Sequence, residues 1–263
     1  MGVTHRRNQP RRAVAESPGS TRFRRRARPA AWLGMGAACA VLLLAVLTAS
    51  AQLPTGERFE GVLLIEDFDT LTPGQQWLDG ERYGQWRVEY AGYGTTTILA
   101  EDGRHQLSMS PRVANDAGTT HGGLVTTLAQ FEDIDLTADL RTERQLRQRA
   151  PNPWEVAWLV WHYTDDNHFY SVVLKPNGWE LGKEDPAYPG SQRYLATGST
   201  PSFPIGMPHT VRVRQVGNEI SVWANGKLLT RYRDTERPYR MGRIGLYTED
   251  AHVYFDSVVV RRP

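Results

Sequence analysis

Hydrophobic and polar positions from Gly61 onward alternate in short runs, which turn residues interrupt every eight to twelve positions. In segment 131–142 the apolar side chains occupy every second position: Ile134, Leu136, Ala138 and Leu140. A strand points successive side chains to opposite faces, so this pattern predicts one face towards a core and one towards water. No amphipathic helix longer than about three turns appears. We therefore predict an all-β fold, an antiparallel β-sandwich of the jelly-roll type.

The turns in this region predict hairpins. Asn225-Gly226 is typical of a type I′ turn between two strands. Residues 164–168 are predicted to close a hairpin that sets Trp161 opposite Ser171 and Tyr163 opposite Phe169. In this register Trp161, Tyr163 and Lys175 face outward. A turn one residue longer or shorter would reverse the two faces, because side chains alternate with a period of two.

The N-terminal 51 residues have a different composition. Residues 1–29 hold nine arginines and one acid and are otherwise rich in Pro, Ser and Gly, so we expect a disordered basic segment. Residues 30–51 form an uncharged apolar run that ends in Ala49-Ser50-Ala51. This order predicts either a cleaved signal peptide or an uncleaved transmembrane anchor helix. Residues 52–263 would then be one secreted or cell-surface domain.

Charge narrows the partners of that domain. Residues 52–263 hold 22 basic and 28 acidic side chains, so their net charge is about −6. Nucleic acid and anionic lipid both need a basic face, so we expect neither as the main partner. Membrane contact is expected only through the N-terminal segment. The sequence does not indicate an oligomeric state.

Several motifs resemble those of a known family. The C-terminal third contains HTVRVRQVGNEISVWANGKLL, GRIGLY and VYFDSVVV, and the first strand contains IEDFD, followed by Trp77 and Trp86. These segments resemble concanavalin A-like lectin/glucanase domains, most closely the 3-keto-disaccharide hydrolase-like and laminin-G-like sandwich modules. The resemblance covers nearly all of residues 60–261. It implies a jelly-roll sandwich that engages a polysaccharide or other glycan, and it does not decide between binding and catalysis.

The predicted outer face of the hairpin and the loop after it suit a sugar. Flat aromatic rings stack on sugar rings, and nearby polar groups bond to sugar hydroxyls. The residues expected to bind carbohydrate are Trp161, Tyr163, Lys175, Trp179 and Tyr188. The alternative reading is that these aromatic rings belong to the core.

An enzyme remains an alternative, either a glycoside hydrolase or a polysaccharide lyase. Paired carboxylates would be supplied by Glu155 with Glu180 or Glu184, and a lyase base and acid by His162 and Tyr170. The E-x-D-x-x-E strand of family 16 glycoside hydrolases is absent from the sequence. A structural or protein-interaction ectodomain is a third possibility.

A structural Ca²⁺ ion is also expected. Glu66, Asp67 and Asp69 cluster at the end of the first strand, and Asp256 lies in the apolar last strand. In the resembling domains these two strands are neighbours, and carboxylate oxygens suit calcium. The leading hypothesis is thus a carbohydrate-binding, lectin-like module outside the cytoplasm, with calcium as a stabilising ion.

Overall fold

The computed structural model describes residues 4–6, 61–116 and 118–263. The apolar run 30–51 and nearly all of the basic segment 1–29 lie outside the described residues, so the signal or anchor and the disorder stay predictions. In the described part of the chain there is no helix, and hence none that could cross a membrane. The prediction of an all-β fold is confirmed.

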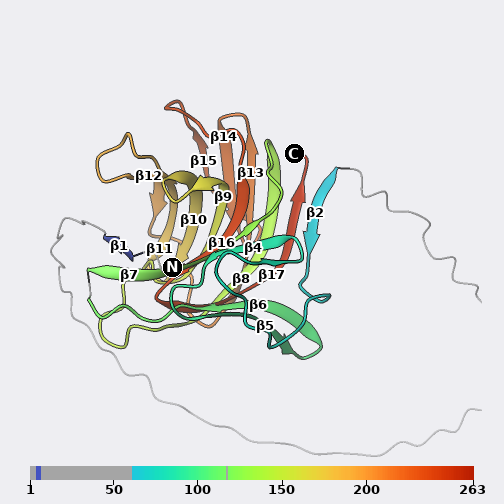
Figure 1. Cartoon of the computed structure of the whole chain (residues 1–263). Helices are drawn as coiled ribbons and strands as arrows, with labels where there is room; N and C mark the ends of the chain where they lie inside the picture. The colour runs from blue at the N-terminus through green and yellow to red at the C-terminus, as the bar shows by residue number, and fades with distance from the viewer. Residues whose placement is uncertain (1–3, 7–60, 117) are drawn as a thin grey trace, which may run out of the picture. The chain divides into compact units, whose positions relative to one another are not determined.

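In the described residues, seventeen antiparallel strands build two sheets (Figure 1). The nine-stranded sheet has the order β12-β11-β10-β9-β16-β7-β4-β3, with β1 paired to β7. Its strands are β1 (Thr4–Arg6), β3 (Arg82–Tyr83), β4 (Trp86–Tyr90), β7 (Thr119–Thr127), β9 (Ala157–Asp165), β10 (His168–Lys175), β11 (Gly178–Glu184), β12 (Gln192–Gly198) and β16 (Arg243–Glu249).

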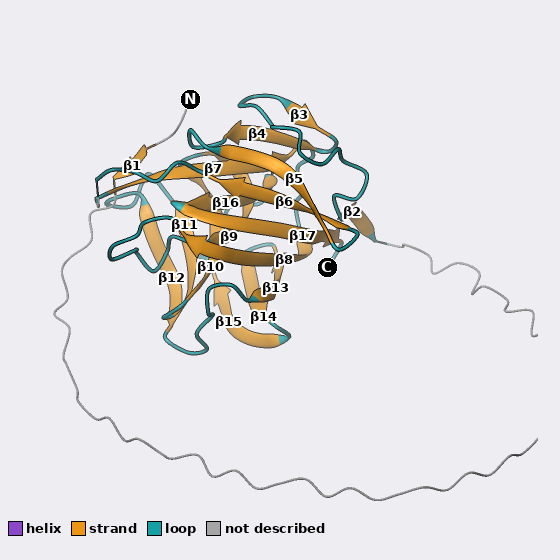
Figure 2. Cartoon of the chain, turned by 90° about the horizontal axis from the view of Figure 1, so that it is seen from below, coloured by secondary structure: helices purple, strands orange, loops and turns teal. Residues whose placement is uncertain are grey.

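The eight-stranded sheet has the order β15-β14-β13-β8-β17-β6-β5, with β2 paired to β17. Its strands are β2 (Val62–Glu66), β5 (Thr95–Glu101), β6 (Arg104–Ser110), β8 (Ile134–Gln145), β13 (Pro208–Val216), β14 (Glu219–Ala224), β15 (Lys227–Arg233) and β17 (Ala251–Arg261). Figure 2 shows the two layers, with β6, β17 and β8 in front of β16 and β9. The first and last strands of the sandwich, β2 and β17, are neighbours as expected.

The core lies between the inner faces of the two sheets. In β8, burial alternates residue by residue from Ile134 onward, which confirms the strand with one wet face. Ala157, Leu159 and Trp161 of β9 reach the core from the other sheet. Burying such apolar area contributes roughly 25 cal/mol per Å² and is the main stabilising term of the sandwich.

The predicted type I′ turn is present at Asn225-Gly226. Both residues have positive φ, 49° and 77°, and Ala224 pairs with Lys227 across them. This turn fixes the register of β14 against β15, and so decides which of their side chains face outward.

Candidate functional site

The register of the β9–β10 hairpin differs from the sequence prediction by one residue. Trp161 lies opposite Tyr170, not Ser171. The Trp161 side chain is fully buried in the core, and its Nε1 donates to Oε1 of Gln215 at 2.7 Å. The prediction of an outward-facing Trp161 is therefore wrong, because the one-residue shift moves the ring to the other face of the sheet.

Trp179 also belongs to the core. It lies opposite Leu174, is 6% exposed, and donates from Nε1 to the carbonyl of Thr200 at 3.0 Å. Lys175 is partly buried beside Glu180, with which it forms an ion pair. Tyr188 is 44% exposed in the loop after β11. Among the predicted sugar-stacking rings, Trp161, Trp179 and Tyr163 are thus buried, with Tyr163 5% exposed, and Tyr188 is accessible.

A backbone irregularity at His162 explains why Tyr163 faces outward although Trp161 faces inward. His162 has φ of +51°, and the pairing of β9 with its neighbours shifts at this point. The extra residue of a β-bulge changes the face on which the following side chain lies. Tyr163 consequently joins Trp158 and Val160 in a second apolar cluster, on the outer face of the nine-stranded sheet.

A carboxylate gathers two tyrosines on this outer face. The Tyr163 hydroxyl donates to Oδ1 of Asp166 at 2.9 Å, and the Tyr90 hydroxyl donates to the same oxygen at 3.2 Å. Tyr163 comes from β9, Tyr90 from β4, and Asp166 from the tight β9–β10 turn. Asp166 is partly exposed, and its Oδ2 accepts no hydrogen bond within the described chain.

Glu89 and Arg243 stand next to these tyrosines. Glu89 Oε1 accepts from Thr126 Oγ1 and from Arg243 Nη1, each at 2.7 Å. The Arg243 guanidinium lies over the Tyr163 ring, 5.2 Å from its centroid. The side chains of Arg243 and Glu89 are 20% and 14% exposed. We call Tyr90, Tyr163, Asp166, Glu89 and Arg243 the outer-face cluster.

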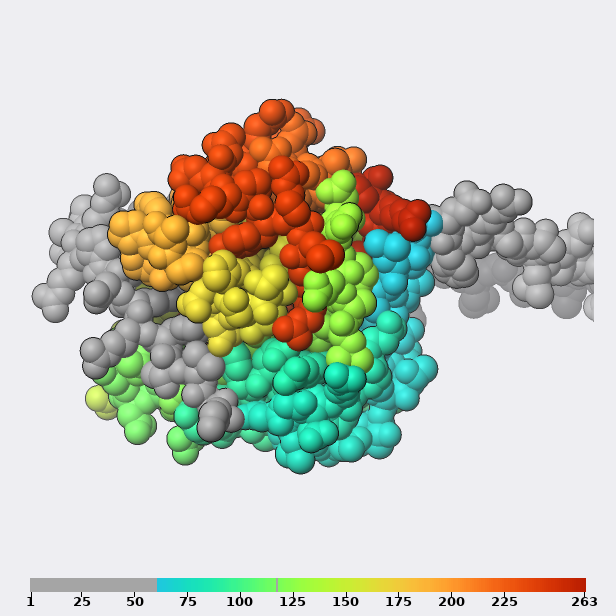
Figure 3. Space-filling model, turned by 45° about the horizontal axis from the view of Figure 1, so that its top comes forward, coloured from blue at the N-terminus to red at the C-terminus, as the bar shows by residue number. Residues whose placement is uncertain are grey.

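Figure 3 shows the β9–β10 turn, in yellow, at the surface between teal residues of the N-terminal strands and orange-red residues that follow β15. Thr164, Asp165 and Asn167 beside Asp166 are exposed, so this turn lies at the surface.

Burial, followed by the Asp166 charge, raises the pKa of Tyr163. The pKa of Tyr90 is raised well above its ordinary value by the same two effects. Both phenols are therefore protonated at neutral pH and act as hydrogen-bond donors. Asp166 is the acceptor for both, which fixes its position relative to β4 and β9.

The rest of the outer face continues the mixture of rings and polar groups. The Trp158 and Tyr247 rings meet edge to face, with centroids 5.3 Å apart. The Tyr247 hydroxyl donates to Oε1 of Glu249 at 2.9 Å. The Thr120 hydroxyl donates to Oε2 of Glu249 at 2.8 Å. The Tyr247 ring lies against Gly122, where a Cβ would approach its hydroxyl oxygen to 2.8 Å.

The predicted catalytic carboxylates do not form one pair. Glu155 is fully buried and accepts from Nε of Arg147 at 2.8 Å and from Nδ2 of Asn152 at 2.8 Å. Glu180 pairs with Lys175 on the outer face, and Glu184 lies four residues further along β11. Glu155 and Glu180 are thus paired with different cations, Arg147 and Lys175.

His162 and Tyr170 form hydrogen bonds with other groups of the protein. Both ring nitrogens of His162 lie within 3.0 Å of backbone carbonyls, those of Tyr239 and Glu132. Tyr170 donates to Oδ2 of Asp234 at 2.6 Å. Both side chains are buried, so no substrate reaches them in this conformation.

The proposed calcium ligands are engaged by protein donors. Glu66 accepts from the backbone of Phe68 at 2.8 Å and from Trp86 Nε1 at 3.0 Å. Asp256 accepts from Arg104 Nη2 at 2.6 Å. Asp67 and Asp69 accept backbone N–H groups. No group of three or more possible metal-binding side chains occurs among the described residues. Calcium binding stays an untested prediction.

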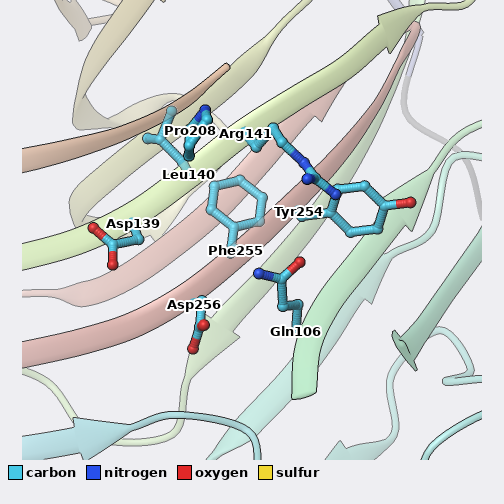
Figure 4. Close-up of a pocket in the computed structure, with 8 residues that line it drawn as sticks. All are labelled: Gln106, Asp139, Leu140, Arg141, Pro208, Tyr254, Phe255 and Asp256. Atoms are coloured by element: carbon cyan, nitrogen blue, oxygen red, sulfur yellow. The ribbon is translucent and has the colours of Figure 1, made fainter. Parts of the chain in front are cut away.

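A small pocket lies on the eight-stranded sheet (Figure 4). Asp139 and Asp256 are cross-strand neighbours there, and Arg141 stacks on Tyr254 with 4.5 Å to the ring centroid. The cavity volume is about 50 Å³, which holds a few water molecules. Typical ligand pockets are larger than roughly 300 Å³, so this pocket is too small for a sugar ring.

Two packed antiparallel sheets form a β-sandwich with the kind of fold that carbohydrate-binding and glycoside hydrolase modules have. The chain belongs to the 3-keto-α-glucoside-1,2-lyase-like domain family, whose family model matches residues 74–261. This confirms the resemblance seen in the sequence. No protein of curated function matches the chain.

A solved structure of low sequence identity has the same fold. The carbohydrate-binding module CBM66 from Bacillus subtilis is 13% identical with a TM-score of 0.51, covering 67% of this chain and 95% of that one. The family 16 endo-glucanase from Bacteroides ovatus is 9% identical with a TM-score of 0.48, covering 75% of this chain and 99% of that one.

The sequence identified Tyr163 but missed Tyr90, Asp166, Glu89 and Arg243. No local signal marks them as a group, because Tyr90 and Asp166 are 76 residues apart. The sequence signal near them is the acidic stretch 164–168, which predicts a turn but no binding site.

Proposed function

We propose that the chain is a carbohydrate-binding module that acts outside the cytoplasm and holds a saccharide at the outer-face cluster. The observation that carries the proposal is the contact between two phenols and Asp166 beside the Glu89–Arg243 pair. Sugar hydroxyls both donate and accept hydrogen bonds. A carboxylate and a guanidinium held side by side meet both needs.

The cluster is preorganised for binding. Its members come from β4, β9, β16 and one tight turn, and each is held by at least one neighbour before any ligand arrives. A rigid site loses little conformational entropy on binding, so more of the contact energy appears as affinity. The basic and apolar N-terminal sequence supports a location outside the cytoplasm.

Binding is tested on a broad panel of oligosaccharides and polysaccharides by glycan array and calorimetry, with and without Ca²⁺. We expect at least one saccharide to bind, with affinity at least tenfold lower in Glu89→Gln and in Asp166→Asn. Glu81→Gln, an exposed carboxylate outside the cluster, is the matched control and keeps full affinity. No binding under any condition, or equal affinity in all variants, overturns the proposal.

A second candidate is elimination from a 3-keto-α-glucoside, the reaction in the family's name. A ketone at C3 makes the hydrogen at C2 acidic. A carboxylate such as Asp166 would take that proton, a C1=C2 double bond would form, and the C1–O bond would break. The contact that favours this candidate is Tyr163 to Asp166 at 2.9 Å, because a phenol beside the base can protonate the departing oxygen.

Turnover is tested with a 3-keto-glucoside, by following the release of the departing alcohol or sugar. The enzyme reading expects release that disappears in Asp166→Asn and falls strongly in Tyr163→Phe. Glu155→Gln and Glu180→Gln should retain activity, since neither residue belongs to the cluster. No turnover in the native chain removes this candidate and leaves the binding proposal intact.

A further inference from the structure

The outer face of the eight-stranded sheet carries four exposed arginines on two strands. Arg212 and Arg214 lie on β13, and Arg231 and Arg233 lie on β15. All four side chains are exposed, and Arg214 and Arg231 both lie in register with Ser221 of β14, so the alternating side chains of these strands lie on the same face. This basic surface belongs to a region, 52–263, whose net charge is about −6.

Two of these arginines are neutralised. Arg212 donates from Nε to Oδ1 of Asp135 at 2.7 Å, and its guanidinium lies 4.8 Å from the centroid of the Trp223 ring. Arg233 forms an ion pair with Glu219. Both pairs hold their arginines in place and cancel their charge.

Within the described residues, the other two arginines, Arg214 and Arg231, form no ion pair. Arg214 lies in register with Asp135 of β8, but the Asp135 carboxylate is held by Arg212. Arg214 and Arg231 both lie in register with Ser221 of β14, one on each side. Neighbouring strands are about 4.8 Å apart, so the two Cα atoms are separated by roughly 10 Å with a hydroxyl group between them.

We infer that Arg214 and Arg231 form an anion-binding surface for an acidic polysaccharide, one that carries carboxylate or sulfate groups. Guanidinium groups bind such oxyanions through two parallel hydrogen bonds, and two of them on the same sheet face can bind charges that recur along a linear chain. Ser221 supplies a hydrogen bond to a sugar hydroxyl between them. A flat sheet face accepts an extended chain without a deep groove.

The choice of a saccharide as the carrier of the anion rests on the proposed function. The anion-binding surface at Arg214 and Arg231 is independent of that proposal, because it lies on the other sheet from the outer-face cluster. A neutral glycan at the outer-face cluster and an acidic one at Arg214 and Arg231 are distinguished by separate variants.

The test uses the full chain and polygalacturonate as the probe, with dextran as the neutral control. Arg214→Gln/Arg231→Gln is compared with Arg82→Gln/Arg149→Gln, which removes two exposed arginines elsewhere. All variants retain the nine arginines of residues 1–29, so differences between variants report on the surface alone. We expect the affinity for polygalacturonate to fall at least fivefold in Arg214→Gln/Arg231→Gln and at most twofold in Arg82→Gln/Arg149→Gln. Raising the salt concentration should lower the affinity of the native chain.

A second measurement is independent of the N-terminal arginines. Phenylglyoxal labelling followed by mass spectrometry reads each arginine separately, and polygalacturonate should protect Arg214 and Arg231 while Arg82 stays reactive. Equal affinity of the two double variants, or no protection, overturns the inference. A single-stranded oligonucleotide that binds as tightly as polygalacturonate through the same two arginines also overturns it, because the surface would then recognise charge alone.

Discussion

The ammonium of Lys183 lies 2.7 Å from Oδ2 of Asp234, and both side chains are fully buried. Lys183 also donates to the carbonyls of Glu236 and Arg237 at 2.7 and 2.9 Å, and Tyr170 donates to Asp234. The pair therefore ties β11 to the segment that joins β15 and β16. Every donor of the ammonium is used, which assigns it a structural role.

Breaking this pair should destabilise the fold strongly. Lys183→Met leaves Asp234 buried without its cation, and a lone buried charge costs about 3 to 5 kcal/mol. The free energy of unfolding in urea checks this. Lys183→Met/Asp234→Leu should recover part of the loss, and a double variant no more stable than the single one would contradict the account.

Acid should weaken the same contact. Burial raises the pKa of Asp234, but the hydrogen bonds from Lys183 and Tyr170 outweigh it and hold the pKa below its ordinary value. The native state thus binds a proton less readily than the unfolded chain, so this stabilisation is present above about pH 4 and is lost as pH falls further. Urea midpoints between pH 3 and pH 7 should fall less steeply in Asp234→Asn than in the native chain.

Glu155 should show the opposite pH dependence. Burial raises its pKa more than Arg147 and Asn152 lower it. The native state holds this proton more tightly than the unfolded chain, so the contribution of Glu155 to stability falls as pH rises above about 4.3. The free energy of unfolding of Glu155→Gln, relative to that of the native chain, should therefore rise between pH 4 and pH 7. A difference that stays constant over this range would contradict the raised pKa of Glu155.

Trp161→Phe should lower stability without changing glycan affinity. The substitution leaves the buried Oε1 of Gln215 without its donor and removes ring volume from the core, at a cost of about 2 to 4 kcal/mol. Thermal unfolding and calorimetry on the same samples separate the two properties. A loss of affinity with unchanged stability would return Trp161 to the binding site.

Gly242→Ala should unfold the chain readily. An added Cβ would lie 2.3 Å from the carbonyl carbon of His162, and this backbone atom cannot move without disturbing β9. We expect the free energy of unfolding to fall by about 1 to 3 kcal/mol or more, the range found for overpacked cores. Gly118→Ala, whose nearest contact is a side-chain oxygen at 3.5 Å, is the control and should be close to neutral.

The strands were predictable from the sequence because alternation and turn chemistry are local. The Asn225-Gly226 turn and the alternating strand from Ile134 are present as expected. The faces of the β9–β10 hairpin were not predictable. They depend on the positive φ of His162, and that conformation is packed against Gly242, 80 positions further along the chain.

The candidate site shows the same limit. Tyr163 could be selected from the sequence by its residue type and neighbours. Asp166 could not be joined to Tyr90, nor Glu89 to Arg243, because only the strand order places them together. Pairings across a sheet are set by the whole topology, which a local pattern does not contain.

The contact between Gly122 and Tyr247 has an evolutionary consequence. A Cβ at position 122 would lie 2.8 Å from the Tyr247 hydroxyl oxygen, so a side chain there requires the ring to move. In related chains the two positions should therefore change together, with a bulkier residue at 122 accompanied by a smaller one at 247. That rule offers a means of sorting family members by whether they keep this ring on the outer face of the nine-stranded sheet.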